Sequence, residues 1–323
     1  MMIEIAVASG KGGVGKSTVS TSIAIYLSRR KRNVVAIDAD ADAANFHLIL
    51  GEDRWDWKKS YSDSMIAKII EEKCIKCGNC LGKCSYKAIY IDERGNYRIN
   101  PILCEGCLTC TLVCPVRGAI VREKVESGKL YRVNTKYGFP LISASLNPGR
   151  PNSGKLVTEE KELAKEIAED DSIIIIDSAA GIGCQVVSSL AGANMVILVA
   201  EPTPASFNAI KRVHVLTKHF MQPVALVINK YDINLQMSDT LEDFAQENNI
   251  DLLGKIPYDE SIPKSMASRV PVIELFPNSP AAKALINISA KVEYIIDNWH
   301  EWFIGHRPKK PEPYKPIIIK PMS

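Results

Sequence analysis

Eight of the nine cysteines lie in two short runs that share the spacing C-x-x-C-x-x-C-x-x-x-C. The runs consist of Cys74, Cys77, Cys80 and Cys84, and of Cys104, Cys107, Cys110 and Cys114. Four thiolates so close in sequence can bind a metal ion or an iron–sulfur cluster. Disulfides are the alternative, but they are typical of small secreted chains, and this 323-residue sequence has no signal-peptide pattern at its start.

A second group of residues has the pattern of a phosphate-binding loop. Residues 10–17 fit G-x-x-x-x-G-K-[ST], which binds nucleotide phosphates when it lies between a strand and a helix. In such a loop, backbone N–H groups face the phosphates, Lys16 adds a positive charge, and the Ser17 hydroxyl can bind Mg²⁺. The residues expected to contact the nucleotide here are Gly10, Lys11, Gly12, Gly13, Val14, Gly15, Lys16, Ser17 and Thr18.

The segments around this loop alternate between strand and helix. The apolar pattern predicts a strand at 3–9, a helix at 16–30 and a strand at 33–40, which together make a β-α-β unit. Beyond the cysteine runs it predicts helices at 155–169 and 205–220, and strands at 172–178, 195–203 and 224–232. Strands that are apolar throughout are typical of a parallel sheet covered on both faces, so we expect an α/β fold.

The cysteine runs interrupt this large domain. We expect the domain to comprise residues 1–55 and 136–304, with a small α+β insert at 56–135. Residues 305–323 are rich in proline and basic residues, which predicts an extended tail that is either disordered or docks a partner.

The phosphate loop resembles that of the MinD/Mrp superfamily, the P-loop ATPases with a deviant Walker A sequence. The likeness lies in an additional lysine, Lys11, which precedes Lys16 in "GKGGVGKST". It extends to "VVAIDADADAANF", which resembles the switch I strand with Asp38 and Asp40, and to "IIIIDSAAGIG", which resembles Walker B and switch II with Asp177 and Gly181. In that family the lysine equivalent to Lys11 reaches the phosphates of a partner subunit, so the resemblance implies a dimer formed on ATP, either of identical chains or with a related chain.

The same resemblance assigns roles to the charged residues. It implies catalysis by Lys11, Lys16 and Asp40, and a Mg²⁺ site formed by Ser17, Asp40 and Asp177, in which Asp40 orients the attacking water. Asp42 continues the alternating row of aspartates, so the sequence alone leaves open whether one of the three only caps the next helix.

Two later segments resemble the part of the family site that holds the base. They are "VINKYD", with Asn229 as the adenine contact, and "PYDES", with Pro257 and Tyr258. The first also reads N-K-x-D through Lys230 and Asp232, which is the guanine-reading motif of GTPases. The phosphate loop favours ATP, and GTP is the alternative.

The cysteine runs resemble those of a bacterial two-cluster ferredoxin. The resemblance implies two 4Fe-4S clusters, each with three cysteines from one run and the fourth from the other. The implied ligand sets are Cys74, Cys77, Cys80 with Cys114, and Cys104, Cys107, Cys110 with Cys84. Proline follows the second run at Pro115, whereas Ser85 takes its place after the first. Zinc is the alternative, although the third and fourth cysteines of each run fit it less well.

Cys184 is the ninth cysteine and follows switch II in "AGIGCQVV". At a similar offset in the nitrogenase iron protein a cysteine helps to bind a cluster shared across the dimer, but that site takes two cysteines from each subunit. Here Cys184 is therefore either a small residue near a dimer interface or a labile metal site.

Together these resemblances imply an ATP-hydrolysing iron–sulfur protein that couples rearrangement of a dimer to electron transfer, with a redox or metallocofactor protein as partner. An iron–sulfur or metallocofactor maturation ATPase of the Mrp type and a MinD-like positioning ATPase are the alternatives. A net charge of +3 without a long basic run gives no reason to expect nucleic acid. Without an apolar run of about 18 residues, we expect no membrane insertion and a cytoplasmic location.

Overall fold

The computed structural model describes residues 1–149 and 153–308. Nine strands form one large sheet, namely β1 (Ile3–Ser9), β2 (Val34–Ala39), β3 (Trp57–Tyr61), β8 (Gly128–Asn134), β9 (Pro140–Leu146), β10 (Ile173–Ala180), β11 (Met195–Ala200), β12 (Val224–Asn229) and β13 (Asp251–Ile256). Their order across the sheet is β13-β12-β11-β1-β10-β2-β9-β8-β3. From β13 to β9 the neighbours are parallel, and β8 and β3 complete one edge as antiparallel strands.

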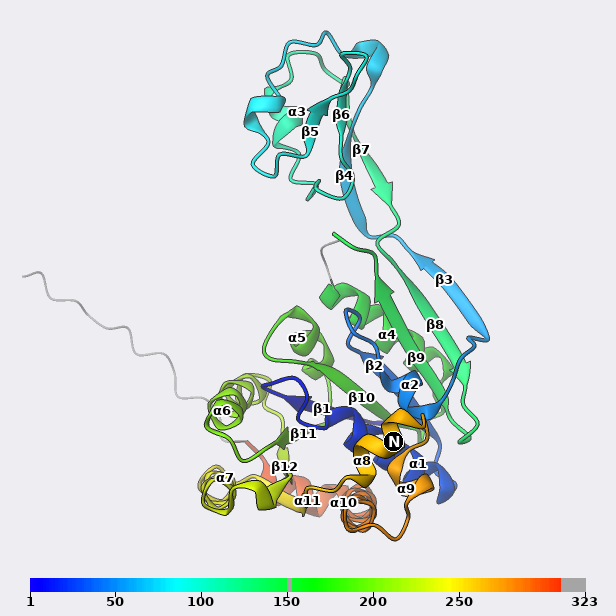
Figure 1. The fold of residues 1–323 in the computed structure, drawn as a ribbon, viewed down its shortest axis with the longest axis vertical. Helices are drawn as coiled ribbons and strands as arrows, with labels where there is room; N and C mark the ends of the chain where they lie inside the picture. The colour runs from blue at the N-terminus through cyan, green and yellow to red at the C-terminus, as the bar shows by residue number, and fades with distance from the viewer. Residues whose placement is uncertain (150–152, 309–323) are drawn as a thin grey trace, which may run out of the picture.

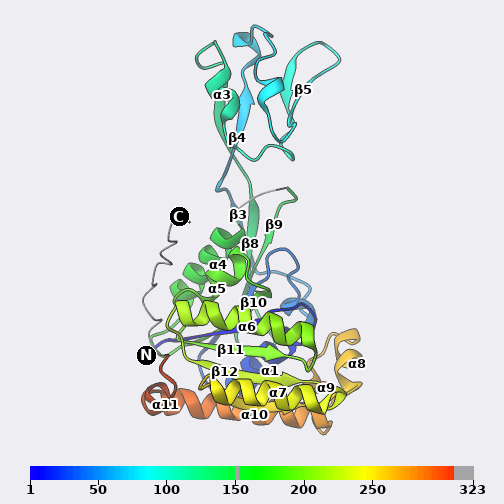
Figure 2. The same ribbon diagram turned by 90° about the vertical axis from the view of Figure 1, so that its left-hand side faces the viewer.

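Helices cover both faces of this sheet (Figures 1 and 2). One face packs against α1 (Lys16–Arg29), α2 (Phe46–Leu50), α8 (Ser261–Ala267), α9 (Val272–Leu275), α10 (Pro280–Asp297) and α11 (Trp299–His306). The other packs against α4 (Ser153–Ile167), α5 (Cys184–Leu190), α6 (Pro204–His219) and α7 (Leu235–Glu247). The successive residues Ile175 and Ile176 of β10 pack into separate cores on opposite faces of the sheet. This explains why the strand is apolar at successive positions.

The expected α/β architecture is confirmed, with a mostly parallel sheet between helices. The predicted strand at 3–9 coincides with β1, and the helix expected at 16–30 is α1. The expected strands at 172–178 and 224–232 are β10 and β12, with ends shifted by two or three residues.

The cysteine-rich segment forms a small unit at one end of the molecule (Figure 1). Its elements are β4 (Ser64–Ile69), η1 (Glu71–Lys73), η2 (Leu81–Lys83), β5 (Ile89–Ile91), β6 (Tyr97–Ile99), α3 (Thr109–Val113) and β7 (Ile120–Val125). The antiparallel pairs β4–β7 and β5–β6 surround a core that includes two cysteines, Cys80 and Cys110. We call residues 62–127 the module.

The module joins the large sheet at its antiparallel edge. Tyr61, the last residue of β3, lies opposite Gly128, the first residue of β8. The range 56–135 expected for the insert therefore includes two strands that hydrogen-bond into the large sheet. No strand was predicted where β9 lies, since its pairing with β2 and β8 depends on residues far apart in sequence.

The end of the described chain is helical. The tail expected from residue 305 begins inside α11, which extends to His306, and residues 309–323 lie outside the described residues. Within the described ranges, no helix is both long enough and apolar enough to cross a membrane.

Candidate functional site

A cavity of about 360 Å³ lies at the carboxyl ends of the central parallel strands. It is lined by Gly12, Gly13, Gly15, Lys16, Ser17, Thr18, Asp40, Asn45, Ile49, Asp177, Ser178, Ala180, Asn229, Lys230, Tyr258, Asp259, Ile262, Pro263 and Met266. Ligands of open α/β sheets bind at this edge, so the fold brings most of the predicted nucleotide residues together. Gly10, Lys11, Val14 and Pro257 are not among the lining residues.

The phosphate loop is held in a shape that two glycines permit. Gly15 has φ +98°, and a Cβ there would lie 2.4 Å from the Asn229 Nδ2 atom. A Cβ at Gly10 would meet the backbone of Ala209 in α6 at 2.3 Å. Any larger residue at either position would push the loop away from the strand ends that support it.

The expected magnesium ligands lie side by side. Asp177 lies within the buried part of β10, and its carboxylate accepts hydrogen bonds from the hydroxyls of Ser17 and, at 2.9 Å, Ser20. Burial raises the pKa of Asp177, while Lys16 and the two hydroxyls act to lower it. Because Lys16 is itself 8% exposed, the positive charge, hydroxyl and carboxylate form one enclosed polar group.

The three aspartates of the alternating row have three different surroundings. Asp38 is fully buried and its Oδ2 accepts from the Phe46 N–H at 2.8 Å, so it holds the start of α2. Burial, and then the nearby Asp177, raise its pKa. Asp42 accepts from Gln185 Nε2 at 2.7 Å, and only Asp40 of the three lines the cavity.

The predicted base contacts are engaged within the protein. Asn229 donates from Nδ2 to the Val14 carbonyl at 2.8 Å, and its Oδ1 accepts from the Lys230 N–H. This places the asparagine as a support for the phosphate loop. Asp232 of the N-K-x-D sequence accepts from the Tyr258 N–H at 2.7 Å, so one oxygen of the guanine-reading carboxylate is already occupied.

Lys11, the additional lysine of the phosphate loop, does not line the cavity. Lys11 Nζ lies 2.9 Å from Glu201 Oε1, and Lys230 Nζ lies 3.3 Å from Glu201 Oε2. Glu201 follows β11 directly, and although burial acts to raise its pKa, the two lysines bring it below its usual value. In the single chain, the residue expected to reach a partner is therefore held by its own subunit.

Several residues of the cavity were not anticipated. Ile49 of α2 and Ile262, Pro263 and Met266 of α8 form an apolar part, next to Tyr258. No local motif marks them, because α8 reaches the site only through the packing of the last third of the chain. Glu160 of α4 was also missed: it is fully buried near Asp38 and Asp40, and burial holds its pKa well above its usual value.

In the module, the eight cysteines line two separate cavities. One is lined by Cys74, Cys77, Cys80 and Cys114, and the other by Cys84, Cys104, Cys107 and Cys110. Each cavity thus contains three cysteines of one run and one of the other. In the described part of the chain, no three His, Cys, Asp or Glu side chains are placed to hold a single metal ion.

The thiols of these two sets differ in exposure. Burial raises the pKa of Cys80, and raises that of Cys110 to about 11, whereas a hydrogen bond with Thr109 lowers the pKa of exposed Cys107. Cys84, the fourth cysteine of the first run, is followed by Ser85 where the second run has Pro115. Its Sγ accepts a hydrogen bond from the Ala88 N–H at 3.3 Å. Ser85 itself is exposed.

Cys184 is exposed at the start of α5, away from both sets. A Cβ at Gly154 would lie 3.0 Å from the Cys184 Cβ atom, so the helix α4 passes closely beside this cysteine.

A chain of contacts links the loop after β2 to the base of the module. Ala41, between Asp40 and Asp42, is buried in a small core with Leu130 of β8 and Ala144 of β9. Its carbonyl accepts from the Leu146 N–H at 3.2 Å. The next residue, Asn147, donates from its backbone to the Ser127 carbonyl at 2.8 Å and from Nδ2 to the Glu126 carbonyl at 3.2 Å.

The contacts continue across Ser127 into the first strand of the module. Ser127 is fully buried, and its Oγ accepts from the N–H groups of Asp63 and Ser64 at 3.0 and 2.8 Å. Five hydrogen bonds thus connect the loop that carries Asp40 with the start of β4.

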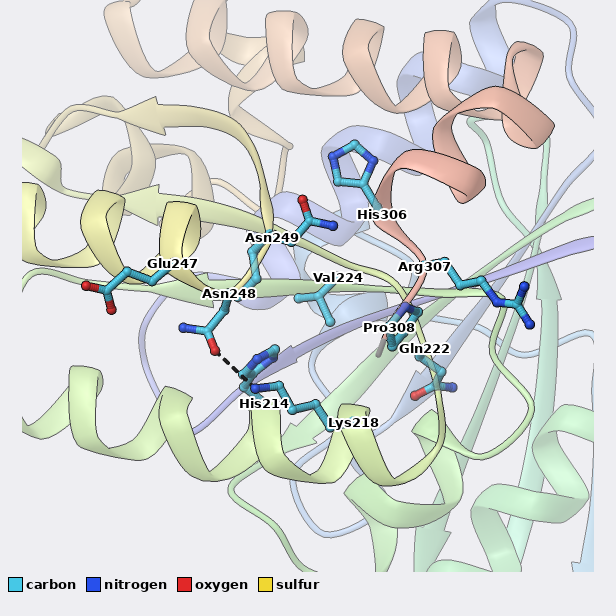
Figure 3. Close-up of a pocket in the computed structure, with 11 residues that line it drawn as sticks. His214, Lys218, Gln222, Val224, Glu247, Asn248, Asn249, His306, Arg307 and Pro308 are labelled. Atoms are coloured by element: carbon cyan, nitrogen blue, oxygen red, sulfur yellow. Dashed lines mark hydrogen bonds between the residues drawn. The ribbon is translucent and has the colours of Figure 1, made fainter. Parts of the chain in front are cut away.

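A larger cavity, of about 560 Å³, lies at the opposite edge of the sheet (Figure 3). His214 of α6 and Val224 at the start of β12 are among its lining residues. None of the predicted site residues is here, so its size does not make it the nucleotide site.

His214 should make stability sensitive to acid. It is 5% exposed, and burial, with Lys218 nearby, lowers its pKa to about 4. As pH falls below about 6.5, the unfolded chain binds the proton first, so the free energy of unfolding drops by about 2 kcal/mol at pH 5. In chemical denaturation, the stability gap between the full chain and His214→Gln should narrow by that amount between pH 7 and pH 5; a constant gap would contradict a buried neutral histidine.

A family model and a relative of similar length both match most of this chain. The family model described as "CobQ/CobB/MinD/ParA nucleotide binding domain" matches residues 5–272. The chain is 34% identical over 303 residues to an uncharacterized protein of Methanocaldococcus jannaschii, MJ0578, covering 92% of this chain and 98% of that one.

Two further likenesses concern the fold and a short segment. The septum site-determining protein MinD of Pyrococcus horikoshii, solved with Mg-ADP, superposes with a TM-score of 0.57 at 20% identity, covering 91% of this chain and 97% of that chain. Pyruvate synthase subunit PorD of M. jannaschii is 47% identical over 55 residues, which are 17% of this chain and 63% of that subunit.

Proposed function

Since the chain belongs to the CobQ/CobB/MinD/ParA family of nucleotide-binding domains and is an ATPase, we propose that its nucleotide state controls one-electron transfer through two 4Fe-4S clusters in the module. The observation that carries this proposal is the separation of the eight cysteines into two cavities. Each cavity has the four-cysteine set that a two-cluster ferredoxin would use.

The residues of the module fit such clusters by number, type and placement. A zinc ion holds its thiolates at about 2.3 Å, and within the described residues no three of these cysteines are placed around a single ion. A four-iron cluster takes one thiolate at each iron, so its ligands stand around a larger group. When bound, each cluster would supply a one-electron redox centre. Cys80 and Cys110 would hold the buried sides, and Cys77 and Cys107 the solvent sides.

The nucleotide cavity supports a division of roles among its residues. We assign the phosphates to the backbone N–H groups of the loop and to Lys16, and Mg²⁺ to Ser17 and Asp177, whose side chains already touch. We assign Asp40 to orient a water, because it is the aspartate of the row that lines the cavity, whereas Asp38 and Asp42 accept hydrogen bonds from Phe46 and Gln185. The apolar part with Ile262 and Met266 suits the flat face of a base.

The link between the two sites supports control of the module by nucleotide. Asp40 and Asp42 flank Ala41, and Ala41 is bonded and packed to the strands that carry the module. A shift of the loop on ATP binding would therefore move Leu146 and Asn147, and with them the base of β4. ATP needs only to favour one arrangement over the other, and about 1.4 kcal/mol of difference changes a one-electron potential by about 59 mV.

Asn147→Ala tests the coupling. It removes the Nδ2 bond to the Glu126 carbonyl, worth about 1 kcal/mol, but leaves the nucleotide cavity and all nine cysteines unchanged. We expect the acceleration of electron transfer by ATP to fall about fivefold, with iron content and ATP turnover retained. Reduced protein, a small acceptor dye and ATP or a non-hydrolysable analogue provide the measurement.

Asn33→Ala is the matched control, because Asn33 is exposed and its side chain donates to Glu169 and Asp171, away from both sites. Equal electron transfer with ATP, with the analogue and in Lys16→Ala would refute the proposed function itself.

We also propose that the active form is a dimer in which Lys11 leaves Glu201 for the partner's phosphates. The Lys11–Glu201 pair is half-exposed and worth up to about 1 kcal/mol, and Glu201→Gln removes its charge. The dimer should then form on ATP at about fivefold lower protein concentration in analytical ultracentrifugation. Weaker dimerisation of Glu201→Gln would show that Glu201 does not compete with the partner.

A MinD-like positioning ATPase is the second candidate, since MinD supplies the structural likeness across most of the chain. That function has no use for eight cysteines in two sets. ATP-dependent assembly that is the same with and without iron would favour it.

A further inference from the structure

The module lies at one end of the molecule, away from the helices and the parallel strands of the ATPase (Figures 1 and 2). One cysteine of each set, Cys77 and Cys107, is exposed, whereas Cys80 and Cys110 are buried. A partner can therefore approach either set from solvent without touching the ATPase.

The positive charge of the chain is concentrated around these sets. Residues 72–118 contain seven Lys and Arg and four Asp and Glu residues, so this stretch alone has a net charge of +3, equal to that of the whole chain. Six exposed cations of this stretch have no ion pair within the described residues, namely Lys73, Lys76, Lys83, Lys87, Arg94 and Arg117. By contrast, Arg98 and Lys68 of the same module are paired with carboxylates.

Two of these lysines occupy positions that the backbone does not favour. Lys76 has φ +59° and Lys87 has φ +50°, a left-handed conformation that glycine or asparagine adopts at lower cost. Lys76 lies directly before exposed Cys77 and lines the first cavity. A long cationic side chain at such positions suits a surface that is recognised rather than one that only turns the chain.

Large apolar side chains accompany the cations. Ile75 is 64% exposed between two cysteines of the first set, and Leu112 is 86% exposed between the last two cysteines of the second run. Tyr86, which lines the second cavity, is 48% exposed. Exposed apolar side chains next to unpaired charged side chains are typical of a transient protein interface.

We propose that the surface around the two cysteine sets (the module face), which carries Lys73, Lys76, Lys83, Lys87, Arg117, Ile75, Tyr86 and Leu112, docks a small acidic one-electron carrier protein. The inference depends on the proposed function, because it assumes that the two cysteine sets hold redox centres. Opposite charge accelerates the encounter and aligns the carrier with Cys77 or Cys107. The short lifetime of electron-transfer complexes suits a contact of less than about 1,200 Å² with few apolar groups.

The test uses the full chain with its clusters, reduced under anaerobic conditions. The electron acceptors are an acidic ferredoxin, a basic cytochrome c and a neutral quinone dye, and the second-order rate is measured for each. For the acidic carrier we expect the rate to fall at least tenfold between about 10 mM and about 300 mM salt. The triple variant Lys76→Glu, Lys87→Glu, Arg117→Glu should cause a similar loss at low salt.

The matched control reverses three exposed lysines of the ATPase part, Lys58→Glu, Lys59→Glu and Lys283→Glu, and should leave all three rates unchanged. The dye rate and the iron content reveal any damage to the module. An acidic-carrier rate that is independent of salt and of the triple variant, in protein with full iron content, would overturn the docking proposal alone. Tight binding of the module face to anionic lipid vesicles in place of the acidic carrier would overturn it as well. A chain that takes up no iron would instead refute the proposed function.

Discussion

Replacing Lys16 by alanine should lower the rate of ATP hydrolysis at least a hundredfold, which corresponds to about 2.7 kcal/mol in the activation free energy. Lys16 lines the cavity and is 8% exposed, and its charge opposes the rise in pKa that burial causes in Asp177 and Asp40. A charge in so enclosed a site acts strongly on the phosphate oxygens, because little water screens it. Release of inorganic phosphate by the full chain gives the rate.

The comparison with two other lysines sharpens this result. Lys11→Ala should retain ATP binding by a single chain but lose ATP-dependent dimerisation, since Lys11 lies outside the cavity. Lys283→Ala, on the exposed side of α10, should behave as the unsubstituted chain. If Lys16→Ala retained a third of the activity, the phosphates would have to lie elsewhere.

Replacing Cys114 by alanine should remove one cluster and reduce the iron content from about eight to about four per chain. Cys114 lines the cavity of the first run, although it belongs to the second run in sequence. Removing one of four thiolates leaves an iron without its protein ligand. Iron and acid-labile sulfide assays, with the visible absorption spectrum, measure the loss.

Double variants reveal whether the ligand sets are crossed. Cys114→Ala with Cys74→Ala should lose no more iron than Cys114→Ala alone, because both cysteines line the same cavity. Cys114→Ala with Cys104→Ala should lose all of it, because Cys104 lines the other cavity. The reverse pattern would mean that each run binds its own cluster. Cys184→Ser is the matched control and should keep about eight irons.

The sequence was sufficient to predict the central strands and the helices next to them. Strands such as β1 and β10 are buried on both faces, so their apolar residues mark them without knowledge of their neighbours. Strands β3 and β8 were placed in the insert, because both have exposed positions and mixed residues. Strand β9 was missed although residues 141–144 are buried, because polar and apolar residues are mixed along it. The membership of these three strands in the sheet depends on pairing between distant segments.

The residues of the candidate sites also fall into those that a local motif predicts and those that only the folded chain brings together. The phosphate loop and the cysteine spacing are local motifs, so the sequence could group their residues before the structure placed most of them around shared cavities. The choice among Asp38, Asp40 and Asp42 needed the positions of Phe46 and Gln185, which no local pattern supplies. Glu201 was not anticipated because its partner, Lys11, lies 190 residues away.

The way in which the module leaves the large sheet has a consequence for its origin. Tyr61 and Gly128 face each other as partners in an antiparallel ribbon, so removal of residues 62–127 leaves two strand ends side by side. A two-residue turn suffices to connect such ends. A gene segment can enter or leave at that single turn without breaking any strand pair of the ATPase. The fold therefore allows an older ATPase to have acquired the cysteine-rich module in one step, and the same turn can accept other small domains.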